Sequence, residues 1–240
     1  MGVAQLANPT RFLSISGKIL PWFWVVTAIL IAGGLYFAFP GSPPDAEMGE
    51  VVRLMYVHPP AAWLAMLCYA AMAVAALGTL IWRHPLADVA QKAAAPIGAA
   101  FTFLGLVTGM LWGQPTWGTW WVWDGRLTSF LVLFLMYLGL IAIWMTASDQ
   151  GRAARIVSIL TLVGAVNIPI IHFSVEWWST LHQPAGVLEG QTDAAFLPPM
   201  FLMLGGYTTL FVSLLLTRMR TEILGRRLRT LQMQAAGAGA

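Results

Sequence analysis

The stretch TSFLVLFLMYLGLIAIWMT, residues 128–146, decides the fold because none of its nineteen side chains is charged. A helix needs about 20 apolar residues, with a rise of 1.5 Å each, to cross the roughly 30 Å hydrocarbon core of a bilayer. The stretch therefore predicts a membrane-spanning helix. Five other stretches have the same character, and together they predict six spans: residues 19–39, 61–82, 93–112, 128–146, 156–173 and 195–216.

The composition of the whole chain supports this interpretation. Of its 240 residues, 58% are hydrophobic and 10% are charged, whereas a soluble domain usually carries about 25% charged residues. We therefore expect an all-α integral membrane protein with a single polytopic domain over residues 1–240. The single cysteine, Cys68, excludes an internal disulfide and a C-x-x-C haem-attachment site. The chain also lacks a G-x-x-x-x-G-K-S/T loop, so it is not expected to bind and hydrolyse ATP through one.

Lysine and arginine are distributed unequally between the two ends of the predicted spans. Eleven of the thirteen lie on one side, and Arg53 and Arg126 lie on the other. Because cytoplasmic loops are enriched in these residues, we expect both termini in the bacterial cytoplasm. The odd-numbered loops then lie at the periplasmic face of the inner membrane. Residues 217–240 form a predicted basic cytoplasmic tail that lies along anionic lipid headgroups.

The third loop is unusually rich in tryptophan. Its sequence, WGQPTWGTWWVWDGRLTS, covers residues 112–129. If the segment is helical, at about 100° per residue, its five indoles share one half of the surface and the helix lies flat on the membrane. One interpretation is an aromatic belt at the membrane interface, and the other is a platform for a planar ligand that glycines allow to approach closely. The predicted platform residues are Trp112, Gly113, Trp117, Gly118, Trp120, Trp121, Trp123 and Asp124.

Histidines flank this segment in the other external loops. His58 precedes the second span, and His182 lies in the fifth loop. Taken singly, each is either a hydrogen-bonded structural residue or a ligand, since two imidazoles can occupy both axial positions of haem iron. A zinc site would need further ligands at close spacing, which these loops lack. Further candidates, as alternative ligands or as partners of a histidine N–H, are His172, Glu176, Trp177 and Trp178.

The polar end of the tryptophan-rich segment has several interpretations. Asp124 and Arg126 either pair with each other, or Asp124 or Thr128 caps the start of the fourth span. Arg53 and Arg126 are the predicted external cations, so they are candidates for contact with a carboxylate-bearing ligand or a partner, as is Thr128. For Arg126, packing at a helix end is an equally good interpretation.

These residues carry a resemblance to a known family. The tryptophan-rich segment resembles the WWD signature of the haem-handling proteins of cytochrome c maturation. The length, the six spans and the segments YVHPPAA, APIGAAFTFLGLVTG and NIPIIHFSVEWWSTLHQ are similar to the haem exporter protein C (CcmC) family over about residues 19–217. The resemblance implies that haem b binds at the periplasmic surface against residues 112–129, with His58 and His182 as axial ligands of the haem iron.

The resemblance also implies a function and partners. The protein is expected to be no enzyme but to present haem to the haem chaperone CcmE, together with the ABC transporter subunits CcmA and CcmB and the small CcmD. A competing hypothesis is a transmembrane haem channel, although the spans hold almost no ionisable residues to line a path and haem could enter sideways from lipid. A third hypothesis is a haem-dependent redox enzyme, for which histidine pairs within the spans are missing, and a fourth is a purely structural subunit.

Overall fold

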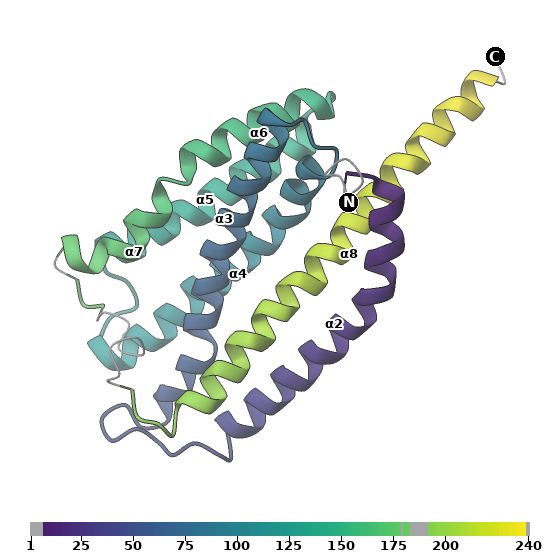
Figure 1. Cartoon of the computed structure of the whole chain (residues 1–240). Coiled ribbons are helices and arrows are strands. Elements are labelled where there is room, and N and C mark those ends of the chain that lie inside the picture. The colour runs from purple at the N-terminus through teal and green to yellow at the C-terminus, as the bar shows by residue number, and fades with distance from the viewer. Residues whose placement is uncertain (1–6, 179, 183–191, 239–240) are drawn as a thin grey trace.

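The computed structural model describes residues 7–178, 180–182 and 192–238, which fold as a bundle of helices (Figure 1). In this part of the chain no β-strand forms, and six helical stretches are long and apolar enough to cross a membrane. The all-α membrane fold predicted from composition is therefore confirmed. The elements are α2 (Pro9–Ala38), η1 (Glu50–Tyr56), α3 (His58–Ile81), α4 (Ala87–Trp117), α5 (Gly125–Thr146), α6 (Gln150–Gly164), α7 (Asn167–Trp177) and α8 (Leu197–Ala238).

Helix α4 lies at the centre of the bundle. It packs against α3, α5 and α8, while α2 packs along α8 at one side of the molecule (Figure 1). Of the six candidate spans, α4 has the largest buried share. Near its C-terminal end, Trp112 contacts Met48 in the segment before α3, and residues 118–124 connect α4 to α5.

Small residues let the central helices approach closely. A Cβ atom added at Gly98 of α4 would lie 2.2 Å from the ring of Tyr137 in α5. The hydroxyl of Tyr137 donates a hydrogen bond of 2.7 Å to the carbonyl of Ala65 in α3. Close packing over glycine and a polar contact between helices are common means of association inside membranes. Here they fix α3, α4 and α5 relative to one another.

The fifth predicted span, residues 156–173, is not one helix. It is divided into α6 and α7, with Ala165 and Val166 between them. Pro169 explains the division, because proline has no N–H to donate to the carbonyl of residue i−4, which here is Ala165. The side-chain amide of Asn167 donates 2.9 Å to the Ser129 carbonyl of α5 and so holds the start of α7.

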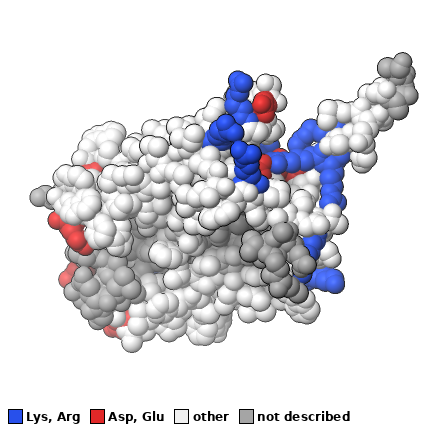
Figure 2. All heavy atoms as spheres, turned by 45° about the horizontal axis from the view of Figure 1, so that its top comes forward, with Lys and Arg blue, Asp and Glu red and all other residues white. Residues whose placement is uncertain are grey.

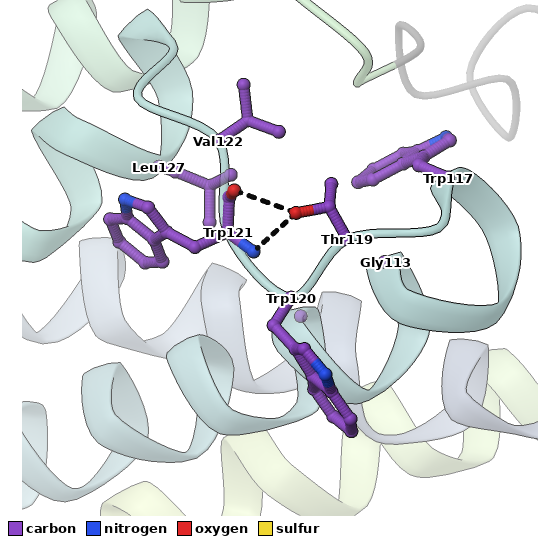
Figure 3. Close-up of a pocket in the computed structure, with 8 residues that line it drawn as sticks. Gly113, Trp117, Thr119, Trp120, Trp121, Val122 and Leu127 are labelled. Atoms are coloured by element: carbon purple, nitrogen blue, oxygen red, sulfur yellow. Dashed lines mark hydrogen bonds between the residues drawn. The ribbon is translucent and has the colours of Figure 1, made fainter.

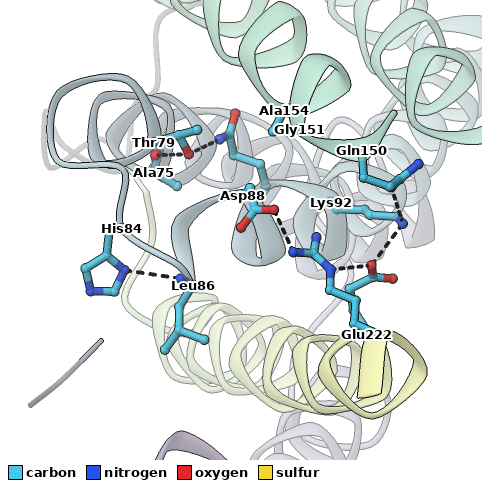
Figure 4. Close-up of polar contacts among 12 residues, drawn as sticks. Ala75, Thr79, His84, Leu86, Asp88, Lys92, Gln150, Gly151, Ala154 and Glu222 are labelled. Atoms are coloured by element: carbon cyan, nitrogen blue, oxygen red, sulfur yellow. Dashed lines mark hydrogen bonds and ion pairs between the residues drawn. The ribbon is translucent and has the colours of Figure 1, made fainter. Parts of the chain in front are cut away.

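The charged residues gather at the ends of the bundle, with the basic ones at the end where α8 emerges (Figures 1 and 2). At this end Lys92 and Arg226 donate to Glu222 at 3.0 and 2.9 Å, and Arg226 also pairs with Asp88 at 2.7 Å (Figure 4). The helix that contains the last predicted span is longer than expected, because α8 continues through residues 217–238. Residues 239–240 of the predicted tail lie outside the described residues, and contact of the tail with lipid stays a prediction.

Candidate functional site

The tryptophan-rich segment is only partly helical. Helix α4 continues to Trp117 and ends where Gly118 adopts a φ of +74°, with its amide bonded to the Gln114 carbonyl at 3.0 Å. A glycine in this left-handed conformation is a common helix C-terminus. Residues 118–124 are not helical, so the predicted interfacial helix with one aromatic face is wrong. The indoles of Trp117, Trp120 and Trp121 point in different directions (Figure 3).

His58 is the first residue of α3 and faces α4. Its Nδ1 lies 3.1 Å from the carbonyl oxygen of Gly105 and 3.1 Å from the hydroxyl oxygen of Thr108. A carbonyl only accepts hydrogen bonds, so Nδ1 carries the proton and Nε2 keeps a lone pair. The edge of the His58 ring also contacts Trp112, with 5.8 Å between the ring centroids. A Cβ atom added at Gly109 would lie 3.1 Å from the His58 ring.

His182 is held by the acidic residue of the tryptophan-rich segment. Its Nδ1 donates to Oδ2 of Asp124 at 3.1 Å, and its ring contacts Trp117 with 4.8 Å between centroids. The Thr180 hydroxyl donates to the same Oδ2, and the Thr180 oxygen accepts from the His182 amide at 3.1 Å. The other oxygen of Asp124 accepts from the Leu127 amide at 2.7 Å and caps α5. The predicted capping role of Asp124 is confirmed.

The protonation states of this pair follow from their surroundings. Burial would raise the pKa of Asp124, but hydrogen bonds from Thr180, the Leu127 amide and His182 together lower it, so the carboxylate is charged. Burial lowers the pKa of His182 and outweighs the opposite effect of Asp124. His182 is therefore a neutral imidazole at pH 7, with the proton on Nδ1.

Both imidazoles lie towards the C-terminal end of α4, with His58 beside Gly109 and Trp112 and His182 beside Trp117. Among the residues that the structure describes, both rings form their hydrogen bonds through Nδ1 and not through Nε2. No group of three or more His, Cys, Asp and Glu side chains suited to a metal ion occurs in the same residues. The arrangement thus offers two neutral nitrogen donors and not a zinc-type cluster.

A pocket and a groove adjoin the histidines. The pocket, lined by Gly109, Gly113 and Trp117 among others, has a volume of about 10 Å³, which is room for about one water molecule (Figure 3). An apolar groove of about 350 Å³ lies beside it, between α4 and α5, and is in the size range of small-molecule sites. Trp121 lines both. The groove is further lined by Phe103, Leu106, Val107, Met110, Trp123, Leu131 and Phe134.

Comparison with known sequences decides the family. The sequence profile of the family described as Heme exporter protein C matches residues 2–234. The chain belongs to the haem exporter protein C family.

Relatives support this assignment over nearly the whole length. The Heme exporter protein C of Bradyrhizobium diazoefficiens is 57% identical over 239 residues, which cover 98% of this chain and 90% of the relative. That of Escherichia coli K12 is 46% identical over 220 residues, covering 92% and 90%. That of Rhodobacter capsulatus is 43% identical over 238 residues, covering 98% of each chain.

In this member of the haem exporter protein C family, the two predicted external arginines have structural partners. Arg126 does not pair with Asp124 by hydrogen bond but donates to Ser174 at 3.3 Å and to the His172 carbonyl at 3.1 Å, which fastens α5 to α7. Arg53 pairs with Glu50 and donates to the Ala38 carbonyl at the end of α2. Thr128 lies in the first turn of α5. Contact of these residues with a ligand stays a prediction.

The predicted secondary residues of this haem exporter C chain lie on or next to α7. His172 is exposed, and its ring contacts Phe173. The acidic partner of His182 is Asp124, and a supporting role for Glu176 stays a prediction. Trp177 is exposed and stacks on Phe173, whereas Trp178 packs against Gly125, where an added Cβ atom would lie 2.8 Å from the indole.

Sequence reasoning missed three residues that position the histidines of this family member: Thr108, Gly109 and Thr180. A signal for Gly109 was present, because Gly105, Gly109 and Gly113 recur every four residues and share one face of α4. Thr108 and Thr180 gave no such signal, since a threonine in a helix or loop has many common roles.

Proposed function

We propose that this protein holds haem b between His58 and His182, against the tryptophan-rich segment, and delivers it during cytochrome c maturation. The observation that carries the proposal is that both rings are held through Nδ1, which leaves both Nε2 atoms for iron. Metal-binding histidines are commonly fixed in this way through their other ring nitrogen. Two neutral imidazoles are suitable axial ligands for haem iron.

The surroundings of the histidines suit an amphipathic porphyrin. Trp120 and Trp123 are 57% and 75% exposed, so their indoles are free to cover a flat apolar ligand. The haem propionates are anions, and the positive groups beside the tryptophan-rich segment that would suit them are Arg126 and the N-terminus of α5. The pocket of Figure 3 is too small to enclose a porphyrin, so haem would lie on the open surface formed by these indoles.

The site is proposed to face the periplasm. Basic side chains gather at the opposite end of the bundle (Figure 2), and such residues favour the cytoplasmic side of a bacterial inner membrane. Haem held at the other end is then accessible to the periplasmic chaperone CcmE. Within this proposal CcmA, CcmB and CcmD are the membrane partners, and the protein itself catalyses no reaction.

The groove favours a route in which haem enters from the lipid, and not one through a channel in the bundle. It is apolar and lies between two helices that are apolar enough to span a membrane, α4 and α5, and Trp121 lines both the groove and the pocket at the tryptophan-rich segment. The centre of the bundle is closed instead, because side chains such as Tyr69, Leu133 and Tyr137 are completely buried there. A haem molecule dissolved in the bilayer would therefore approach sideways.

The test is the visible spectrum and pyridine haemochrome of the detergent-purified full chain, loaded with haem. The wild type is expected to show bis-histidine haem b, and His58→Ala and His182→Ala should each lose at least nine-tenths of that signal. His172→Ala is the matched control, because His172 is exposed on α7, and it should keep the wild-type spectrum. Absence of haem from the wild type, or unchanged spectra in both ligand variants, would refute the proposal.

Delivery is tested separately from binding. The loaded wild type is mixed with purified CcmE, and covalently bound haem is measured on denaturing gels. The expected result is haem on CcmE from the wild type and none from either ligand variant. Binding without transfer would leave a haem protein that does not deliver to this chaperone.

A further inference from the structure

The two proposed axial ligands have hydrogen-bond partners of different charge. Nδ1 of His58 faces a backbone carbonyl and a hydroxyl, both at 3.1 Å and both neutral. Nδ1 of His182 faces the carboxylate of Asp124 at 3.1 Å. The side chains of Asp124 and His182 are 3% and 16% exposed, so this contact is little screened by water.

A carboxylate partner changes what an imidazole does to iron. By accepting the Nδ1 proton strongly, it raises the basicity of the ring and fixes Nε2 toward the metal. A more electron-rich axial ligand stabilises ferric iron more than ferrous iron, which makes hydrogen bonding around the ligands one of the means by which a protein sets the haem potential. A neutral carbonyl partner has a much smaller effect.

We infer that Asp124 is a positioning residue that makes His182 the stronger of the two axial ligands, so that the site favours ferric over ferrous haem. The inference rests on the proposed function. Asp124, the acidic residue of the tryptophan-rich segment, then acts on the iron through His182 and does not contact the porphyrin face. The tryptophan-rich segment thereby has two roles. Its indoles form the apolar surface, and its Asp124 strengthens the bond from iron to His182, which lies 58 residues further along the chain.

The position of Asp124 is fixed independently of the ligand. Its Oδ1 accepts from the Leu127 amide at 2.7 Å, and its Oδ2 accepts from both Thr180 and His182. Thr180 and His182 therefore compete for the charge on one oxygen. Removing the Thr180 hydroxyl should strengthen the bond to His182, and removing the charge of Asp124 should weaken it. The two changes are expected to shift the haem potential in opposite directions.

The experiment is a spectroelectrochemical titration of the haem-loaded full chain. Asp124→Asn keeps an acceptor for the α5 cap but loses the charge. We expect the preference for ferric over ferrous haem to fall at least tenfold, which raises the midpoint potential by about 59 mV for one electron. Thr180→Val should lower the potential. Thr108→Val is the matched control at His58, and it should shift the potential by less than either.

The outcomes separate the inference from the proposed function. Unchanged potentials in Asp124→Asn and Thr180→Val, with haem still bound, would overturn the inference and leave haem binding intact. Loss of the bis-histidine spectrum in Asp124→Asn but not in Thr108→Val would support it, because His182 is then no longer held toward the iron. If Asp124→Asn does not accumulate, the direction in which Thr180→Val shifts the midpoint potential tests the inference. A lower potential supports it, and an unchanged or higher potential overturns it. A wild type that binds no haem would overturn both.

Discussion

At the scale of single residues, the contact between Asp124 and His182 makes the site sensitive to pH. Burial lowers the pKa of His182, while hydrogen bonds lower that of Asp124 despite burial. In the folded protein both groups therefore take up a proton at lower pH than they do in an unfolded chain. The net contribution of these two groups to the stability of the fold, which comes from burying a neutral ring beside a hydrogen-bonded carboxylate, is fully present above pH 6.5, the ordinary pKa of histidine. It decreases as the pH falls below that value.

We predict that the His182 ring titrates below pH 6.5 in the haem-free protein. The measurement is an NMR titration of the chain labelled with ¹³C at its four histidines, with the His182 signal assigned by its loss in His182→Ala. In Asp124→Asn the midpoint should move lower still, because the carboxylate stabilises the charged ring. A midpoint at or above 6.5 in the wild type would contradict the burial of this ring.

At the scale of elements, α4 positions His58 through a face made of glycine residues. The Gly105 carbonyl accepts from the ring, and Gly109 leaves the space that the ring occupies. A methyl group at position 109 would lie 3.1 Å from the ring, which is closer than ordinary contact. The ring would have to move away from α4 and from its hydrogen bond.

We therefore expect Gly109→Ala to weaken haem binding at least tenfold without unfolding the protein, since alanine in place of glycine favours a helix by about 1 kcal/mol. The measurements are haem titration by absorbance and the midpoint of thermal unfolding. Gly139→Ala in α5 is the matched control, because an added Cβ atom meets nothing within 4 Å there. Equal haem affinity in the two variants would show that Gly109 is not needed by His58.

At the scale of the whole molecule, one charged cluster connects helices at the basic end. Glu222 of α8 accepts from Lys92 of α4 at 3.0 Å and from Arg226 at 2.9 Å, and its side chain is 17% exposed. Lys92 also donates to Gln150 of α6 at 3.0 Å (Figure 4). The cluster thus joins α4, α6 and α8 at the end opposite His58 and His182.

Glu222→Gln should lower the free energy of unfolding by about 1–2 kcal/mol, between the values for exposed and fully buried ion pairs. Two cations would lose their shared acceptor, so the unfolding midpoint in detergent should fall by a few degrees. Glu176→Gln removes an exposed carboxylate of α7 and should leave the midpoint unchanged. Haem affinity should be the same in both variants, and a selective loss in Glu222→Gln would show that the two ends are coupled.

The parts predictable from sequence were those set by composition and local pattern. Six apolar stretches predicted the helices, and Asp124 before Gly125 suggested a cap. The extent of α4 was missed because Gly118 ends it only after the tryptophans begin, and α6 and α7 were joined because Pro169 is tolerated in many membrane helices. The contact between Asp124 and His182 was out of reach. Arg126 fastens α7 to α5 and so brings residues 180–182 near Asp124. No local sequence pattern indicates that these distant segments lie close together.

The two carboxylate oxygens of Asp124 accept hydrogen bonds from different parts of the chain. Oδ1 belongs to the start of α5 through the Leu127 amide, and Oδ2 belongs to residues 180–182. Loss of the Oδ2 contacts would leave the bond from the Leu127 amide to Oδ1, and so the cap of α5, in place. The start of α5 therefore does not depend on the contact between Asp124 and His182.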